Sequence, residues 1–133
     1  MIYSVDVEVT APVRDTELSD HVREAIQTIF PSADPVEGDG ELRTTVHDLE
    51  RFSELLRRQE TLDTAREHLR GTVRDDEFSF RLKKQAALEG VVTFEIDDNA
   101  ELGAIAVRVR VHDPDPEGFI EYVTAPADGD DRS

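Results

Sequence analysis

The sequence predicts a two-layer α+β domain in which helices pack on one face of a largely antiparallel sheet. The first observation behind this prediction is the order of the elements along the 133 residues: strand, helix, strand, two helices, three strands and a final helix. The second is that each strand is apolar on one side only, whereas strands covered on both faces are apolar throughout. We expect a single domain over residues 1–124 and a disordered acidic tail over residues 125–133.

The chain opens with a strand followed by a helix. Residues 3–10 alternate apolar and polar side chains, which is typical of a strand with one buried face. Apolar residues then recur at helical spacing over residues 18–29. Asp15 or Thr16 can cap this helix at its start, and Pro31 marks its end.

A second strand and a pair of helices follow. Residues 31–40 contain proline and glycine and predict a loop, and residues 42–46 alternate as a short strand. Two amphipathic helices are predicted over residues 48–59 and 62–70, with Gly71 ending the second. The break between the helices falls in the short gap between these two ranges.

Three strands and one helix complete the domain. Strict alternation predicts strands over residues 78–82, 92–96 and 105–111. The Asp-Pro-Asp-Pro segment at residues 113–116 opens a last short helix, which buries apolar side chains within residues 119–123.

The polar sides of these strands share the uncovered face of the sheet. Four arginines gather on this face and form a secondary set of candidate binding residues: Arg43, Arg81, Arg108 and Arg110. The same face also carries Asp6, Glu8, Thr45, His47, Ser79 and Lys83.

Composition excludes several classes of protein. The formal charge is 15 minus 31, or −16, and the cations comprise 13 arginines and two lysines. This acidity with so few lysines indicates a salt-adapted archaeal protein, with an ordinary acidic protein as the alternative. The lack of cysteine excludes disulfides and thiolate chemistry. No apolar run or leader is apparent, so we expect a cytoplasmic protein with no membrane association.

The charge is unevenly distributed along the chain. Residues 1–50 hold 3 basic and 12 acidic residues, residues 51–84 hold 9 and 7, and residues 85–133 hold 3 and 12, giving −9, +2 and −9. The middle segment is therefore the candidate contact region, because arginine forks bind phosphate oxygens and stack on bases. The candidate RNA contacts are Arg51, Arg57, Arg58, Arg66, Arg70, Lys83, Lys84 and Gln85.

Two alternatives compete with RNA for these cations. They can form pairs along solvated helix faces with Glu54, Glu60, Asp63 and Glu67. Alternatively, they can bind acids of a partner, which would make the chain a homo-oligomeric or protein-docking module without an RNA ligand. Pairs closed within one chain, such as Glu54 with Arg58 or Asp63 with Arg66, would favour neither RNA nor docking.

Motifs for catalysis are lacking. The four histidines are scattered and do not have metalloprotease spacing, and the seven glycines form neither a phosphate-binding loop nor a dinucleotide fingerprint. In so acidic a chain, neighbouring carboxylates arise by chance and are weak support for a metal site. We therefore expect a protein that is not an enzyme and has no cofactor or metal.

Five short blocks resemble a known family. They are Leu49-Glu50-Arg51-Phe52, Leu55-Leu56-Arg57-Arg58-Gln59, Leu62-Asp63-Thr64-Ala65-Arg66, Lys84-Gln85-Ala86-Ala87 and Leu102-Gly103. Over residues 2–123 the chain is similar to an uncharacterised archaeal family described as predicted exosome-subunit or RNA-binding proteins, here of haloarchaeal type. The resemblance implies RNA binding, a link to the exosome or the ribosome, and a fold like that of the ribosomal protein that holds 5S RNA. It implies no catalytic residue, and Lys83 departs from it because asparagine is expected there.

Overall fold

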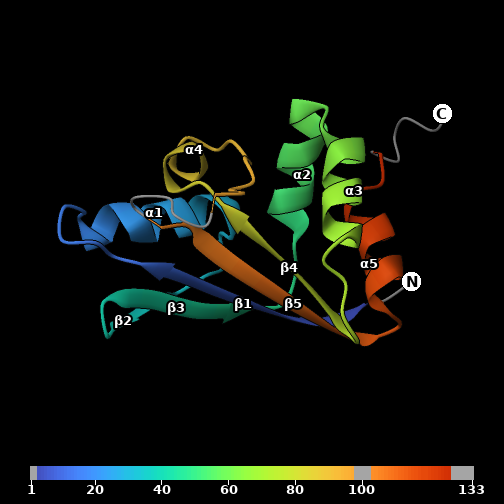
Figure 1. Ribbon diagram of the computed structural model, residues 1–133, viewed down its shortest axis with the longest axis horizontal. Coiled ribbons are helices and arrows are strands. Elements are labelled where there is room, and N and C mark those ends of the chain that lie inside the picture. Colours follow the sequence, from blue (N-terminus) through green and yellow to red (C-terminus); the bar gives the residue numbers. More distant parts are fainter. Residues whose placement is uncertain (1–2, 98–102, 127–133) are drawn as a thin grey trace.

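A five-stranded antiparallel sheet carries the helices on one face. The structure is a computed structural model that describes residues 3–97 and 103–126. Its elements are β1 (Ser4–Pro12), α1 (Ser19–Ile29), β2 (Val36–Gly38), β3 (Glu41–Val46), α2 (Glu50–Gln59), α3 (Leu62–Arg70), β4 (Glu77–Leu82), α4 (Lys84–Leu88), β5 (Ile105–Asp113) and α5 (Pro116–Val123). The strand order is β2-β3-β1-β5-β4, and the helices lie above the sheet in Figure 1. The predicted two-layer α+β class is confirmed, whereas the likeness to the ribosomal protein stays a prediction.

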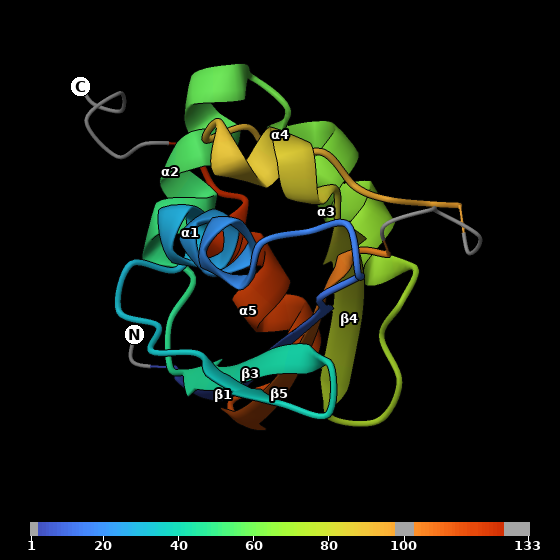
Figure 2. The ribbon, with the colours of Figure 1, turned by 90° about the vertical axis from the view of Figure 1, so that its left-hand side faces the viewer.

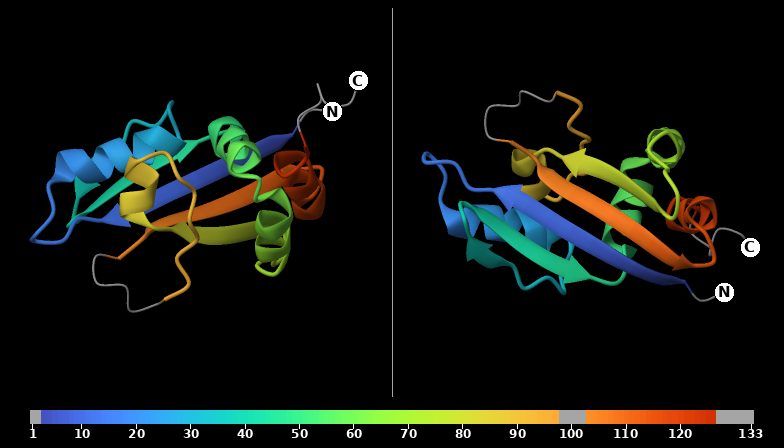
Figure 3. Two further views of the ribbon diagram at one scale, coloured as in Figure 1. Left: turned by 90° about the horizontal axis from the view of Figure 1, so that it is seen from above. Right: turned by 60° about the horizontal axis from the view of Figure 1, so that its bottom comes forward.

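The core lies between the central strands and the helices. β1 and β5 pair in antiparallel register with Val7 opposite Val109 and Val9 opposite Val107, and these side chains are buried. Ile26 of α1, Phe52 and Leu56 of α2 and Ile120 of α5 cover them from the helix layer. The opposite face carries no helix and comes forward in the right-hand view of Figure 3. The alternation of apolar and polar residues along the strands thus produces one buried and one open face.

Two small elements of the structure were not predicted. β2 lies within the expected loop and pairs with β3 through a turn at Asp39 and Gly40, both of which have positive φ. This Asp-Gly turn suits a tight hairpin, because its twist matches that of the strands. α4 follows β4 directly and packs beside α1, as Figure 2 shows.

The expected strand at residues 92–96 is wrong. Only an isolated bridge forms there, between Phe94 and Leu82 at the end of β4. Phe94 packs into the core layer, its ring 4.5 Å from that of His68, whereas Ile96 is 79% exposed. Alternation correctly predicted that Val92 and Phe94 face inward, but it was wrong for Ile96, because the chain leaves the sheet after one bridge.

The expected caps of the first helix are also wrong. α1 begins after Leu18, and neither Asp15 nor Thr16 forms a cap hydrogen bond. Both are exposed in the turn before the helix, while Glu17 in the same turn points to Lys84. The last helix begins as predicted, because the Asp115 carboxylate accepts a hydrogen bond of 2.6 Å from the Gly118 N–H.

Two further expectations concern the ends of the domain and membranes. Of the expected tail, residues 127–133 lie outside the described residues. Ala125 and Pro126 follow the end of α5 and have no regular secondary structure. Among the residues that the structure describes, no helix is long and apolar enough to cross a bilayer.

Candidate functional site

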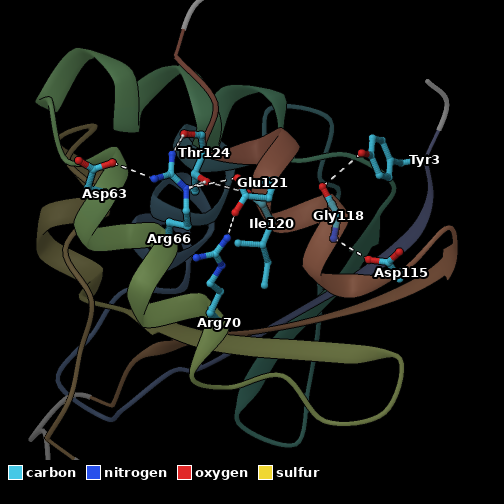
Figure 4. Close-up of polar contacts among 9 residues, drawn as sticks. All are labelled: Tyr3, Asp63, Arg66, Arg70, Asp115, Gly118, Ile120, Glu121 and Thr124. Carbon is cyan, nitrogen blue, oxygen red and sulfur yellow. Dashed lines mark hydrogen bonds and ion pairs between the residues drawn. The ribbon is translucent and has the colours of Figure 1, made fainter.

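Arg66 of α3 binds the end of α5. Its guanidinium donates to the Thr124 carbonyl at 2.8 Å and to the Thr124 hydroxyl at 3.0 Å, and it pairs with Asp63 at 2.8 Å (Figure 4). The Arg66 side chain is only 23% exposed. A cation at this position satisfies a carbonyl at the end of α5 and is favoured by the helix dipole. Arg66 therefore joins two helices, and little of it is available to a ligand.

Other predicted contacts on α2 and α3 also pair within the chain. Arg70 binds Glu121 of α5, which lies 3.8 Å from Arg66 as well (Figure 4). On α2, Glu54 binds Arg51 at 3.0 Å and Arg58 at 3.5 Å. The expected pairs of Glu54 with Arg58 and of Asp63 with Arg66 are confirmed. Within residues 3–97 and 103–126, no ion pair forms with the other two predicted acids, Glu60 and Glu67.

Lys84 is buried and does not lie on the surface. Its ammonium donates to Glu17 at 2.9 Å and to the Pro12 carbonyl at 2.6 Å. The side chains of Lys84 and Glu17 are 7% and 11% exposed. The buried pair ties α4 to the segment between β1 and α1, so the expectation that Lys84 touches RNA is corrected. Its neighbours Lys83 and Gln85 are exposed.

Arg57 differs from the other arginines of α2 and α3. It is half-buried and donates to the Ser53 hydroxyl at 3.0 Å. Ser53 is buried and donates in turn to the Val123 carbonyl of α5. In the part of the chain that the structure describes, no carboxylate forms an ion pair with Arg57. Its guanidinium therefore binds a neutral hydroxyl rather than a carboxylate.

Arg57 lines a groove between α2, α5 and the start of β1. The groove has a volume of about 1050 Å³, and Arg51, Ser53 and His47 also border it. Its floor is apolar, with Val5, Leu49, Phe119 and Val123 all buried. Acidic side chains also line it: Asp48 and Glu50 at the start of α2, and Glu54 within this helix.

Two tyrosines complete the wall of this groove. Tyr122 of α5 is 53% exposed, and its ring centroid lies 4.9 Å from that of Tyr3. The Tyr3 hydroxyl donates to the Gly118 carbonyl at 3.2 Å, which fixes it against α5 (Figure 4). The sequence reasoning missed both tyrosines and Ser53. Tyr122 could have been found, because helical spacing that buries Phe119, Ile120 and Val123 leaves Tyr122 facing outward.

Charges alternate on the open sheet face. Arg108 binds Glu8 at 2.7 Å and Glu77 at 3.6 Å, and the hydrogen bond that Arg108 donates to Glu8 raises the pKa of Arg108. The remaining secondary candidates also have partners: Arg110 lies 3.9 Å from Asp76, Arg43 binds Glu41, and Arg81 is engaged as well. The predicted arginines do share this face, but with acids interleaved among them.

A cluster of two histidines and one carboxylate also lies on the open face. Asp6 binds His112 at 2.8 Å and His47 at 3.2 Å. The hydrogen bond with His112, followed by the charges of both histidines, holds the pKa of Asp6 below its ordinary value. Neither this cluster nor any other group of three or more His, Cys, Asp or Glu side chains among the described residues is arranged so that it could hold a metal ion.

Comparisons with known proteins agree with this fold. A family model described as RNA binding matches residues 6–112. A UPF0200/UPF0201 protein of Archaeoglobus fulgidus is 35% identical over 130 residues, which are 97% of this chain but 40% of that protein. A UPF0201 protein of Metallosphaera sedula is 33% identical over 110 residues, 77% of either chain.

Solved structures of the same kind match most of the chain. The crystal structure of a UPF0201 protein from Methanococcus jannaschii superposes with a TM-score of 0.82 at 34% identity, over 93% of this chain and 96% of that one. That of another uncharacterised UPF0201 protein gives 0.84 at 33% identity, over 90% and 92%. The chain belongs to the archaeal UPF0201 family, and it also matches the family model described as RNA binding.

Proposed function

We propose that this protein is a non-enzymatic RNA-binding protein and that RNA contacts it in the groove between α2 and α5. The observation that carries the proposal is the Arg57 guanidinium, which borders the groove and has no carboxylate partner among the described residues. Arginine donates in a fixed fork that suits phosphate oxygens. The family description as RNA binding supports the same ligand.

The ion pairs of the other arginines favour Arg57 as the phosphate contact. Arg66 and Arg70 already bind groups of α5, and Arg51 and Arg58 share Glu54. A phosphate would have to displace these carboxylates, whereas at Arg57 it would only add to a hydroxyl contact. The Ser53 hydroxyl accepts from Arg57 and donates to Val123, so both its roles are engaged, which supports binding rather than nucleophilic chemistry.

The net charge shapes how such a protein would bind. A chain of charge −16 repels a polyanion at long range. We propose that it acts in the cytoplasm of a salt-adapted archaeon, where a Debye length of about 3 Å at molar salt screens this repulsion. Counterion release contributes little under those conditions, so binding depends on short, directed contacts. Exosome or ribosomal proteins are the partners that we propose for such an RNA-binding accessory protein.

Adjacent arginines on α2 provide the test. Crosslinking of the full chain to a random-sequence RNA pool at about 1 M KCl should recover RNA well above background. Arg57→Gln should weaken binding about ten-fold or more, as expected for the loss of a charged hydrogen bond. Arg58→Gln is the matched control, because Arg58 lies outside the groove and should leave binding unchanged.

Thermal unfolding of both variants separates a lost contact from a lost fold, and Arg57→Lys, which keeps the charge, should retain part of the affinity. The proposal is overturned if the native chain recovers no RNA, or if Arg58→Gln weakens binding as much as Arg57→Gln. A native dimer that Arg57→Gln dissociates, with no RNA recovered, would favour the docking alternative.

A further inference from the structure

We propose that the groove takes an unpaired RNA base, which stacks on the exposed ring of Tyr122. This inference rests on the proposed RNA-binding function and names the class of RNA. Tyr122 is 53% exposed, and two other rings hold it from behind: Tyr3 at 4.9 Å and Phe119 at 6.1 Å between centroids. Phe119 is buried, and Tyr3 is hydrogen bonded to Gly118. The ring is therefore a supported platform rather than a loose side chain.

An exposed, supported ring selects for single strands. Bases in a duplex are already stacked on their neighbours, whereas unpaired bases can be splayed out onto aromatic side chains. Such stacking depends little on sequence and contributes on the order of 1–3 kcal/mol per base in other proteins. Because stacking involves no net charge, molar salt does not screen it, which suits a chain of charge −16.

The rest of the groove is arranged to accept a nucleotide. Its volume of about 1050 Å³ is at the upper end of small-ligand sites, enough for a base with its sugar and phosphate. The buried side chains of Val5, Leu49 and Val123 form an apolar floor for a base edge. Arg57 of α2 also lines the groove, and the guanidinium N–H groups that do not donate to Ser53 can bind a phosphate oxygen.

A protein partner fits this groove less well than a nucleotide. Stable protein interfaces bury on the order of 800 Å² per partner around apolar anchors. Among the described residues, the exposed large apolar side chains other than Tyr122 lie outside the groove: Leu18, Val36, Val91 and Ile96. One supported ring and one guanidinium without a carboxylate partner among the described residues line the same groove, and they provide one stacking surface and one anion contact, which are the two contacts that a nucleotide needs.

The tyrosines themselves provide the readout. The chain has two tyrosines and no tryptophan, and both tyrosines line the groove, so its intrinsic fluorescence reports on this site. At about 1 M KCl, titration with an unstructured mixed-sequence RNA oligonucleotide should quench tyrosine emission after correction for RNA absorbance. A blunt RNA duplex of the same length should quench it little. Inorganic phosphate at matched ionic strength should leave it unchanged.

Variants at position 122 separate stacking from other contacts. Tyr122→Leu removes the ring and should weaken binding of a dye-labelled oligonucleotide about 5-fold to 150-fold by anisotropy. Tyr122→Phe keeps the ring and should bind within about two-fold of the native chain. The unfolding temperatures of both variants show whether α5 remains in place.

The outcomes distinguish this inference from the function on which it rests. If the native chain binds RNA but Tyr122→Leu binds single strands equally well, or if the duplex competes equally, base stacking is refuted and RNA binding stands. Equal loss in Tyr122→Leu and Tyr122→Phe also refutes stacking. If no RNA binds the native chain by crosslinking or anisotropy, the proposed function fails as well. Dimerisation lost in Tyr122→Leu without any RNA binding would assign the groove to a second copy.

Discussion

Lys84 shows how burial changes the role of a charged residue. It is one of only two lysines, and its place in a cationic segment predicted a surface contact. In the structure it is the first residue of α4 and binds Glu17, in the turn before α1, and the Pro12 carbonyl. The family block that begins at Lys84 thus includes a residue that holds the fold together, independently of any ligand.

Removing Lys84 should destabilise the fold strongly. Lys84→Met leaves the Glu17 carboxylate nearly buried, and among the described residues the Arg14 N–H at 2.8 Å is its other hydrogen-bond donor. The expected loss is about 3–5 kcal/mol in the free energy of unfolding, measured with urea. Glu17→Leu with Lys84→Met should recover most of it, because no unpaired charge remains. Lys83→Met is the matched control and should change stability by less than about 0.5 kcal/mol. Equal stability of Lys84→Met and the native chain would contradict the structural role.

Part of the candidate site could be predicted from residue types and part could not. The sequence placed Arg57 and Arg66 in one set, because both occupy amphipathic helices of a cationic segment. Their difference arises from contacts with residues more than fifty positions away. Arg66 binds Thr124 directly, whereas Arg57 is linked to Val123 only through Ser53. Such contacts depend on how α5 packs, which no local spacing encodes.

The turn between α2 and α3 determines how these two helices lie relative to each other. Glu60 ends α2 with φ of 59°, a left-handed conformation that favours glycine, and the Thr61 N–H donates back to the Leu56 carbonyl. A glutamate is unfavourable here for two reasons. Its Cβ strains the left-handed backbone, and its carboxylate places a negative charge at the negative end of the helix dipole. This turn sets the two helices side by side above the sheet, where both reach α5.

Glycine at this junction should stabilise the protein. We expect Glu60→Gly to raise the free energy of unfolding by about 1 kcal/mol, because it relieves the left-handed strain. Glu67→Gly is a matched change inside α3 and should lower it by about 0.5 kcal/mol, the helix propensity cost. Urea unfolding of both variants measures the difference. A loss of stability in Glu60→Gly would show that the Glu60 side chain, rather than the turn, matters.

At the element scale, most of the fold followed from periodicity. The long strands and four helices have enough residues for alternation or helical spacing to be unambiguous. β2 has three residues and α4 five, too few for either period to emerge. The error at residues 92–96 has a different origin: a segment that packs alternate residues inward can do so through one bridge, without joining a ladder.

At the scale of the whole molecule, acids outnumber cations by 16. The ion pairs use many of the cations, so a surplus of carboxylates remains that no cation can neutralise. Their mutual repulsion opposes the compact state and is screened by salt. Stability should therefore depend on ionic strength more than on any single pair.

Thermal unfolding in KCl tests this dependence. Raising KCl from low concentration to about 1 M should raise the Tm by at least about 4 °C, roughly 1 kcal/mol for a domain of this size. The combined variant Glu24→Gln, Glu89→Gln removes two exposed carboxylates for which the described residues provide no ion pair. Its Tm should be higher at low salt and rise less with KCl. A Tm that is independent of KCl would contradict the role of repulsion.

The position of the groove has a practical consequence for handling the protein. Tyr3 near the start of the chain and Pro126 near its end both border the groove. A purification tag or a fused domain joined at either end would leave the fold beside Tyr122 and Arg57. A tag or fused segment rich in arginine or lysine would place extra cations near a site proposed to hold phosphate, and would inflate RNA affinity. An attachment point in the β2–β3 turn, outside the groove, avoids that artefact.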